Sequence, residues 1–337
     1  MSESLIIKGL TAVFSPDPDL RNASGIDIEV KGNRITAVGP DISGDYDTII
    51  DGSNCVAIPG LVNTHHHFYQ VLTRAIRRMQ DSPLFPWLVD HYRVWQGITR
   101  EAVYWSSLAA MGELLLTGCT TTTDHHYLFP AETDVDLIDH QFKAARLLGI
   151  RFHATRGSMS VGKSSGGLPP DSVTQTEEMI LEDCLRVMEL YHDPSDDSMQ
   201  RLALAPCSPF SVSEKLMMQT AELARKHNLK LHTHLAETID EENYCLKNFN
   251  CRPVELMQRL NWIGDDVWFA HCVHLSPAEI ELFGETGTGV AHCPSSNMRL
   301  GSGIAPICEL LRVGAPVGVA VDGSASNDSS DMLGEVR

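Results

Sequence analysis

The sequence lacks the features expected of a protein that binds nucleic acids or membranes. Its 26 Lys and Arg residues are outnumbered by 44 Asp and Glu residues, which gives a formal net charge of -18. An acidic surface repels phosphate backbones and anionic lipids, so we expect no nucleic-acid or membrane partner. The sequence also has no apolar run that approaches the roughly 20 residues of a membrane-spanning helix.

The cysteines lack the arrangement of a disulfide framework. There are nine of them, an odd number, and no Cys-x-x-Cys pair occurs. The opening MSESLIIKGL has neither the basic head nor the apolar core of a signal peptide. We therefore predict free thiols and a cytoplasmic protein. A small molecule is the expected partner, and a homo-oligomer is compatible with the sequence.

The 337 residues suit one large α/β barrel or two ordinary domains. Residues 1–58 have a β-type pattern, in which Gly32-Asn33 is the signal of a two-residue hairpin turn. The pattern predicts a small β-sheet subdomain, the N-terminal half of a β-sandwich. Its expected strands are Leu5–Phe14, Asp27–Val30, Ile35–Val38, Thr48–Ile50 and Cys55–Ile58.

From residue 59 to residue 337, short apolar runs alternate with segments of helical periodicity, which predicts parallel βαβ units. Eight such strands close most naturally into a (β/α)8 barrel. The expected helices include Glu101–Leu116, Leu137–Leu148, Thr176–Tyr191, Ser213–His227 and Pro253–Leu260. The expected strands are Leu61–His67, Cys119–His126, Ile150–Ser158, Leu202–Ser208, Leu229–Glu237, Val267–Leu275, Gly289–Ser295 and Pro316–Ser324.

Polar, reactive residues stand at the C-terminal ends of seven of these eight runs. Barrel enzymes build their active sites at these ends. A doubly wound open sheet is the alternative fold, but such a sheet forms its site at one switch point and does not explain reactive residues on nearly every strand.

Histidines in two of these runs have the spacing of metal ligands. Side chains alternate faces along a strand, so His65 and His67 share one face and His66 takes the other. In the fifth run His232 and His234 also share a face, and the residues alone leave open which of them reaches a metal. Glu237 follows, where a carboxylate can carry protons.

Two later runs add further candidates. His271 ends an apolar run, whereas His274 is as compatible with packing as with function. Asp322 directly follows an apolar strand, where a carboxylate is costly unless it is paired or binds metal. Its alternative role is an N-cap of the next helix, a position that Ser324 or Asn327 can also fill.

Three imidazoles and one carboxylate form a ligand set for one divalent metal, Zn²⁺ or alternatively Fe²⁺, which can activate a water molecule. A second metal would need a bridging ligand such as a lysine from the third or fourth strand, and neither contains one. The cytidine-deaminase signature is also absent. His125, His126 and His292 receive no role.

Six ordered motifs identify the chain as resembling the amidohydrolase superfamily, in the branch of cytosine, guanine and S-adenosylhomocysteine deaminases and triazine hydrolases. NTHHHFYQVLTRA followed by LFPWL is most similar to the 8-oxoguanine deaminases. The six motifs, between about Pro59 and Asp328, are PGLVNTHHHFYQ, LAPCSPFSVS, LHTHLAET, FAHCVHL, AHCPSSNMRLGSG and VAVDGSASND.

The resemblance assigns roles to individual residues. It implies His65, His67, His234 and Asp322 as metal ligands. Glu237 is then the proton shuttle, His271 contacts the attacking water, and Asp322 accepts its proton. Gln70 matches a glutamine with which purine deaminases hold the base. Trp87, from the aromatic Phe85–Trp87 stretch, and Cys207 are added as candidate substrate contacts, although Trp87 is equally compatible with a core position.

The expected reaction is the hydrolytic deamination of a small aromatic heterocycle, with 8-oxoguanine giving urate and ammonia. The alternatives are a hydroxytriazine, guanine or S-adenosylhomocysteine as the substrate. A non-catalytic barrel scaffold is a further alternative, but it is disfavoured because every metal ligand is present. Relatives continue beyond their eighth strand with a helix and returning β-strands, so we expect this chain to be a fragment that ends soon after strand eight.

Overall fold

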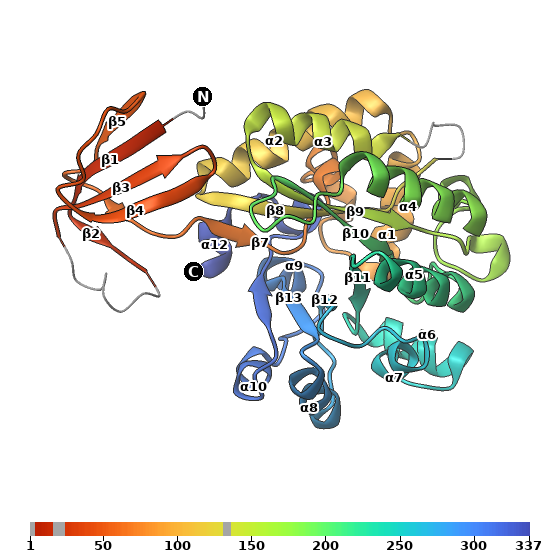
Figure 1. Ribbon diagram of the computed structural model, residues 1–337. Coiled ribbons are helices and arrows are strands. Elements are labelled where there is room, and N and C mark those ends of the chain that lie inside the picture. The colour runs from red at the N-terminus through yellow and green to blue at the C-terminus, as the bar shows by residue number, and fades with distance from the viewer. Residues whose placement is uncertain (1–3, 16–23, 131–135) are drawn as a thin grey trace. The chain divides into compact units, whose positions relative to one another are not determined.

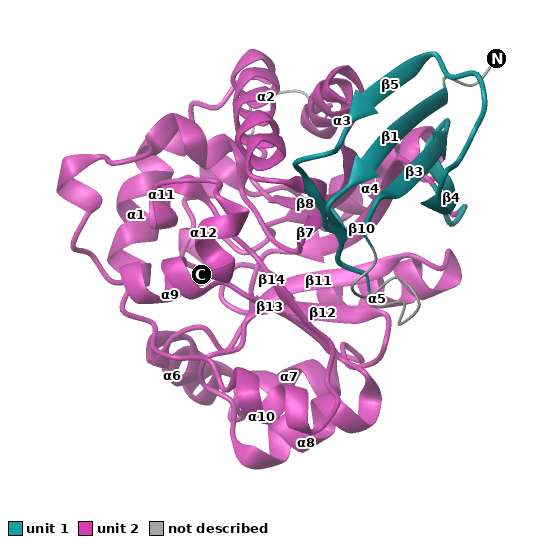
Figure 2. Cartoon of the chain, turned by 90° about the vertical axis from the view of Figure 1, so that its left-hand side faces the viewer, with its two compact units in different colours: residues 1–60, 195–197 teal, residues 61–194, 198–337 magenta. Residues whose placement is uncertain are grey.

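The computed structural model describes residues 4–15, 24–130 and 136–337. The chain divides into two compact units, shown in different colours in Figure 2. The first comprises residues 1–60 and 195–197, and the second comprises residues 61–194 and 198–337. Among the described helices, none is both long and apolar enough to cross a lipid bilayer.

The first unit contains a small β-sheet in which the strand order is β4-β3-β1-β5. The predicted turn at Gly32-Asn33 is confirmed, because it joins β3 and β4 as an antiparallel hairpin in which Lys31 pairs with Arg34. Its strands are β1 (Ser4–Leu10), β3 (Ile26–Lys31), β4 (Arg34–Pro40) and β5 (Thr48–Asp51), beside the short pair β2 (Ala12–Val13) and β6 (Val56–Ala57).

The second unit confirms the (β/α)8 barrel. Its eight parallel strands are hydrogen-bonded in their order along the chain. Thr64 joins the two edge strands, since its N–H and its Oγ1 donate to Val319 O at 3.2 and 3.1 Å. The strands are β7 (Leu61–Asn63), β8 (Cys119–His126), β9 (Arg151–Ser158), β10 (Gln200–Pro206), β11 (Lys230–Leu235), β12 (Val267–His271), β13 (Gly289–His292) and β14 (Val317–Val319).

Helices surround these strands (Figure 1). Several begin at a Ser or Thr whose side chain accepts a hydrogen bond from the first turn, the preferred N-cap arrangement. These N-caps are Thr99, Thr176, Ser213, Thr238 and Ser276. The main helices are α1 (Leu84–Trp95), α2 (Arg100–Leu116), α3 (Leu137–Leu148), α4 (Glu177–Tyr191), α5 (Glu214–Lys226), α6 (Ile239–Phe249), α7 (Pro253–Arg259) and α8 (Pro277–Thr286).

Short helices follow the first, the third and the last strands of the barrel. They are α9 (Pro294–Arg299), α10 (Ile307–Arg312), α11 (Ser324–Asn327), α12 (Met332–Val336) and the 3-10 helices η2 (Phe68–Thr73), η3 (Arg77–Met79), η4 (Lys163–Ser165) and η5 (Asp171–Val173).

Several predicted strand ends are wrong. The first run was expected to extend to His67, but β7 ends at Asn63 because the chain leaves the ladder there and enters η2. The eighth run ends at Val319 rather than Ser324, since Asp322 adopts a left-handed backbone with φ of 59°. In contrast, β8 and α3 begin and end at the predicted residues.

Candidate metal centre and active site

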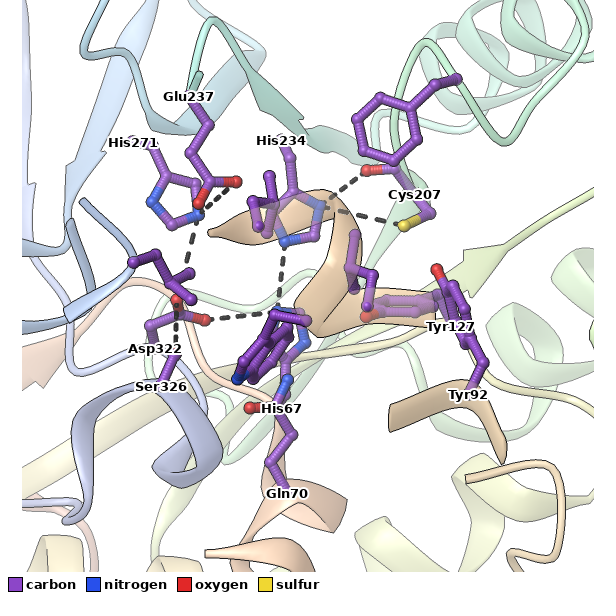
Figure 3. A pocket seen from close by; sticks show the side chains of 15 residues that line it. His67, Gln70, Tyr92, Tyr127, Cys207, His234, Glu237, His271, Asp322 and Ser326 are labelled. Carbon is purple, nitrogen blue, oxygen red and sulfur yellow. Dashed lines mark hydrogen bonds and ion pairs between the residues drawn. The ribbon is translucent and has the colours of Figure 1, made fainter. Parts of the chain in front are cut away.

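Imidazole groups from two parts of the barrel converge on one point. His65 and His67 lie just beyond β7, and His234 lies on β11. Figure 3 shows His67 and His234 beside each other. One nitrogen of each lies within 4.8 Å of the others, and His67 Nε2 is 3.1 Å from His234 Nε2. Asp322 Oδ1 completes the group, 3.4 Å from His65 Nε2 and 3.3 Å from His67 Nε2.

Backbone carbonyls fix the tautomers of two of these rings. His67 Nδ1–H donates to His125 O at 2.8 Å, and His234 Nδ1–H donates to Cys207 O at 2.7 Å. Because a carbonyl oxygen only accepts, the proton of each neutral ring lies on Nδ1. The Nε2 atoms therefore keep the free lone pairs that a metal ligand requires.

A relay of three groups gives His65 the same tautomer. His232 Nδ1–H donates to Trp268 O at 2.9 Å, so His232 Nε2 has to accept. It accepts from His65 Nδ1–H at 2.7 Å. The fully buried His65 Nε2 makes no hydrogen bond among the described residues. The donor set therefore fits a divalent ion, and His232 has no free nitrogen to offer it.

Asp322 is held by the groups around it. Ser296 Oγ donates to Oδ2 at 2.6 Å, and Gly323 N–H donates to Oδ1 at 2.7 Å. These two donated hydrogen bonds favour the ionised form of the carboxyl. The alternative N-cap role is wrong, because Gly323 occupies the N-cap position of α11 and no side chain caps it.

Glu237 and His271 form a second pair beside this cluster, with His271 Nε2 3.6 Å from Glu237 Oε2. Burial raises the pKa of Glu237, which favours the protonated carboxyl. Burial lowers the pKa of His271, but the carboxylates of Glu237 and Asp322 outweigh it and raise that pKa. The pair can therefore hold and pass a proton near neutral pH.

The chain bends sharply where these groups are presented. Ala236 has a φ of 52°, His271 of 73° and Asp322 of 59°, all in the left-handed region that non-glycine residues rarely adopt. Such conformations cost about 1 to 3 kcal/mol each and concentrate at functional sites. They turn the side chains that follow the strands toward a common point.

Glu241 is a residue that the sequence reasoning missed. Its two carboxylate oxygens accept hydrogen bonds from Ala236 N–H and Glu237 N–H, each at 2.9 Å. Burial raises its pKa to about 7. A Thr followed three residues later by Glu is the signature of a helix start, and Thr238 is indeed the N-cap of α6. That signal predicts the helix but not the contact of Glu241 with the preceding turn.

A small pocket opens beside the cluster. About 30 Å³ of its volume is free, which is space for one or two water molecules. Gln70, Trp87 and Cys207 lie in its wall, as the sequence reasoning expected, whereas Phe85 packs on Phe210 instead. Residues that were not anticipated in the wall are Leu84, Leu88, Tyr92, Tyr127, Phe210, Leu300 and Ser326.

The aromatic stretch Phe85–Trp87 is part of the helix α1, which supplies Leu84, Trp87, Leu88 and Tyr92 to the pocket wall. Trp87 is buried as well as pocket-lining, so the two interpretations of this residue are compatible. A bicyclic ring needs more room than this free volume, so side chains of the wall have to move to admit one.

The unassigned histidines differ in their surroundings. His125 Nε2–H donates to Ala205 O at 2.8 Å, and His274 Nε2–H donates to Ser302 O at 2.9 Å, so both support neighbouring backbone. Neither nitrogen of His126 has a hydrogen-bond partner among the described residues, and the same is true of Nδ1 of the half-buried His292. None of these four lines the pocket described above.

Comparison with known proteins agrees with this geometry. The chain is 52% identical over 287 residues to an 8-oxoguanine deaminase of Pseudomonas aeruginosa and 36% identical over 326 residues to a hydroxydechloroatrazine ethylaminohydrolase of Pseudomonas sp. strain ADP. These alignments cover 85% and 93% of the chain. The chain spans 64% and 67% of the lengths of these two relatives.

A solved structure of an atrazine chlorohydrolase from Arthrobacter aurescens TC1, complexed with zinc, matches with a TM-score of 0.94 at 35% identity. That match covers 98% of this chain and 75% of the other. The family model described as "Amidohydrolase family" matches residues 56–337, which include the whole barrel. The chain belongs to the amidohydrolase family.

Proposed function

We propose that this chain is the catalytic barrel of a zinc-dependent deaminase, and that its substrate is the oxidised purine base 8-oxoguanine. The single observation that carries the proposal is the convergence of the imidazole cluster, Asp322, Glu237 and His271 on one pocket. The 52% identity to an 8-oxoguanine deaminase supports the choice of substrate.

The proposed ligands of the metal are His65, His67, His234 and Asp322. Nitrogen and oxygen donors of this kind suit Zn²⁺, and Fe²⁺ is the alternative. A bound divalent ion supplies Lewis acidity, which lowers the pKa of a water molecule and stabilises developing negative charge. The zinc in the structure of the atrazine chlorohydrolase supports this choice.

The proton transfers are assigned to this chain's own residues. Asp322, whose ionised form is favoured by hydrogen bonds from Ser296 Oγ and Gly323 N–H, accepts a proton from the attacking water. Glu237, whose raised pKa favours the protonated form, donates a proton to the ring nitrogen beside the carbon under attack. His271 hydrogen-bonds the oxygen that this carbon gains. The bond from this carbon to the amino group then breaks: the amino group takes the proton held by Asp322 and leaves as ammonia, while the hydroxyl group on the carbon returns a proton to Glu237 and becomes the ring carbonyl.

The pocket wall suits a flat, neutral ring. The Gln70 amide can both donate to and accept from the edge of a purine. Its Oε1 is buried and has no hydrogen-bond partner among the described residues, so it is available to a substrate. Trp87, Tyr92 and Tyr127 supply aromatic surface. None of the residues in this wall is a Lys or Arg that would hold a phosphate.

A second candidate is a hydroxytriazine aminohydrolase. The 36% identity to a hydroxydechloroatrazine ethylaminohydrolase and the structural match to an atrazine chlorohydrolase favour it. A hydroxytriazine is also flat and neutral, so the same wall can contact it.

Release of ammonia, or of ethylamine from an N-ethyl hydroxytriazine, distinguishes these substrates. We would measure kcat/KM for 8-oxoguanine, guanine, isocytosine, S-adenosylhomocysteine and a hydroxytriazine with the zinc-loaded protein. We expect 8-oxoguanine to be preferred. A triazine preferred over every purine by tenfold, about 1.4 kcal/mol in the activation free energy, would overturn the substrate assignment and leave the deaminase chemistry intact. A protein that binds no metal and releases no ammonia would point to a scaffold.

A further inference from the structure

The short helix α9 and the turn that follows it contact the three groups with proposed roles in the reaction, Asp322, His271 and Glu237. The sequence reasoning gave none of the residues of this segment a role. In chain order the contacts are Ser296 Oγ to Asp322 Oδ2 at 2.6 Å, Asn297 Oδ1 to His271 Nδ1 at 2.9 Å and Ser302 Oγ to Glu237 Oε1 at 3.4 Å.

Asn297 determines which nitrogen of His271 faces the reacting groups. The amide oxygen only accepts, so His271 Nδ1 carries a proton and donates it to Asn297 Oδ1. The other nitrogen, Nε2, then points toward Glu237 Oε2 at 3.6 Å. Both Asn297 and His271 are 1% exposed, so no bulk water competes for this hydrogen bond.

The turn after α9 links Asn297 to Glu237 through hydrogen bonds of Ser302. Ser302 N–H donates to Asn297 O at 2.9 Å, which closes the turn. Ser302 Oγ then donates to Glu237 Oε1, while His274 Nε2–H donates to Ser302 O at 2.9 Å. Asn297 therefore lies at one end of a hydrogen-bonded turn whose other end contacts the proposed proton carrier.

We propose that Asn297 is a positioning residue for the proton transfer, acting through His271. The proposal rests on the function proposed above. Asn297 holds the ring of His271 in the orientation and tautomer in which Nε2 serves Glu237 and the oxygen at the reaction centre. A misplacement of about 1 Å at a reacting group can reduce turnover roughly 100-fold, so a residue that only orients the ring has a large kinetic effect.

Kinetics of the zinc-loaded enzyme test this role. We expect Asn297→Ala to lower kcat by about 10- to 100-fold with KM and zinc content nearly unchanged. Asn297→Asp keeps an acceptor of the same size in the same place, so its kcat should be at least tenfold higher than that of Asn297→Ala. Met298→Ala is the matched control, because Met298 is the next residue of α9 and is 72% exposed.

A double-mutant cycle separates a positioning role from a structural one. If Asn297 acts through His271, adding Asn297→Ala to His271→Gln should change kcat by less than twofold. A purely structural effect would instead multiply with that of His271→Gln. Multiplicative effects, or an Asn297→Asp variant no better than Asn297→Ala, would overturn the proposal.

Histidine tautomers give a readout that needs neither metal nor substrate. In the metal-free protein with ¹⁵N-labelled histidine, at a pH high enough for the His271 ring to be neutral, the His271 signal, assigned by its loss in His271→Gln, should show a protonated Nδ1. In Asn297→Ala at the same pH the signal should shift toward a mixture of tautomers. An unprotonated Nδ1 in the wild type would refute the inference. If no base releases ammonia but the tautomer result holds, the proposed function fails and the role of Asn297 in orienting His271 stands.

Discussion

Gly323 lies so close to Gln70 that any side chain at position 323 would have to displace the Gln70 amide. A Cβ built on Gly323 would overlap Oε1 and Cδ of Gln70 and lie 2.8 Å from its Nε2. The three nearest heavy atoms all belong to this one side chain. The φ of Gly323 is -79°, which any residue adopts, so backbone conformation does not require the glycine. Its absent side chain instead leaves the space in which the Gln70 amide lies.

We expect Gly323→Ala to displace Gln70 without altering the proposed metal ligands. The KM for a purine base should rise about tenfold, the effect of about 1.4 kcal/mol of lost binding, while zinc content stays unchanged. Gly112→Ala is a matched control, because a Cβ there has nothing within 4 Å. An unchanged KM in Gly323→Ala would contradict the placement of Gln70 at the substrate.

Glu237→Gln should abolish most turnover and leave metal binding intact. Glutamine keeps the size of the side chain but has no acidic proton to donate. We expect kcat to fall by about 10²- to 10⁴-fold, the usual contribution of positioned proton transfer. The measurement is ammonia release together with elemental analysis of the same preparation. Glu255→Gln, on the exposed side of α7, serves as the control, and near-normal turnover in Glu237→Gln would disprove the shuttle role.

His232 is expected to control metal affinity although it is not a ligand. His232→Phe keeps a ring that can stack on Trp268, whose ring centroid lies 4.3 Å away. The variant removes the acceptor that fixes the His65 tautomer. Loss of an outer hydrogen bond to a metal-binding histidine typically costs 10- to 100-fold in affinity, which competition with a chelator would measure.

His140→Phe, on α3, is the matched control for this affinity measurement. An unchanged zinc affinity in His232→Phe would mean that His65 needs no such relay. Complete loss of zinc with an unfolded circular dichroism spectrum would indicate a packing role instead.

The sequence predicts the barrel well because the hydrophobic periodicity of its strands and helices is local. The run Cys119–His126 and the helix Leu137–Leu148 have the predicted bounds. The sequence predicts that His65 and His67 point the same way because side chains alternate along a strand. However, β7 ends at Asn63, so this alternation does not determine their positions. Their positions depend on contacts made far away in the sequence.

The supporting residues of the site could not be predicted for the same reason. Asn297 and Ser296 each contact a group 26 residues away, and Ser302 contacts one 65 residues away. A serine or asparagine in a turn is common, and neither carries a periodic signal. The residues of the fifth run alone left His232 and His234 open, and the family resemblance favoured His234. The tautomer relay, which depends on the carbonyl of Trp268 in a different strand, gives the physical reason for that choice.

Asp124 connects the fold to the site and gives a prediction on pH. Its Oδ1 accepts a hydrogen bond from the N–H of Phe68, the residue after His67, and its Oδ2 accepts one from Gln141 Nε2. The side chain is fully buried, and burial raises its pKa from 3.8 to about 7. The native state therefore keeps a proton between pH 4 and 7 that the unfolded chain has already released.

The contribution of this carboxyl group to the free energy of unfolding is therefore fully present below about pH 4 and is lost as the pH rises through 7. Asp124→Asn removes the titration, and the Gln141 amide can turn its unpaired Oε1 toward the new amide group. The unfolding free energy of the wild type minus that of Asp124→Asn should fall by a few kcal/mol between pH 5 and 8. Urea titrations at four pH values would measure it, because other ionisable groups cancel in the difference. Asp81→Asn, at an exposed position, is the matched control. A difference for Asp124→Asn that does not vary with pH would show that Asp124 is ionised in the native protein throughout this range.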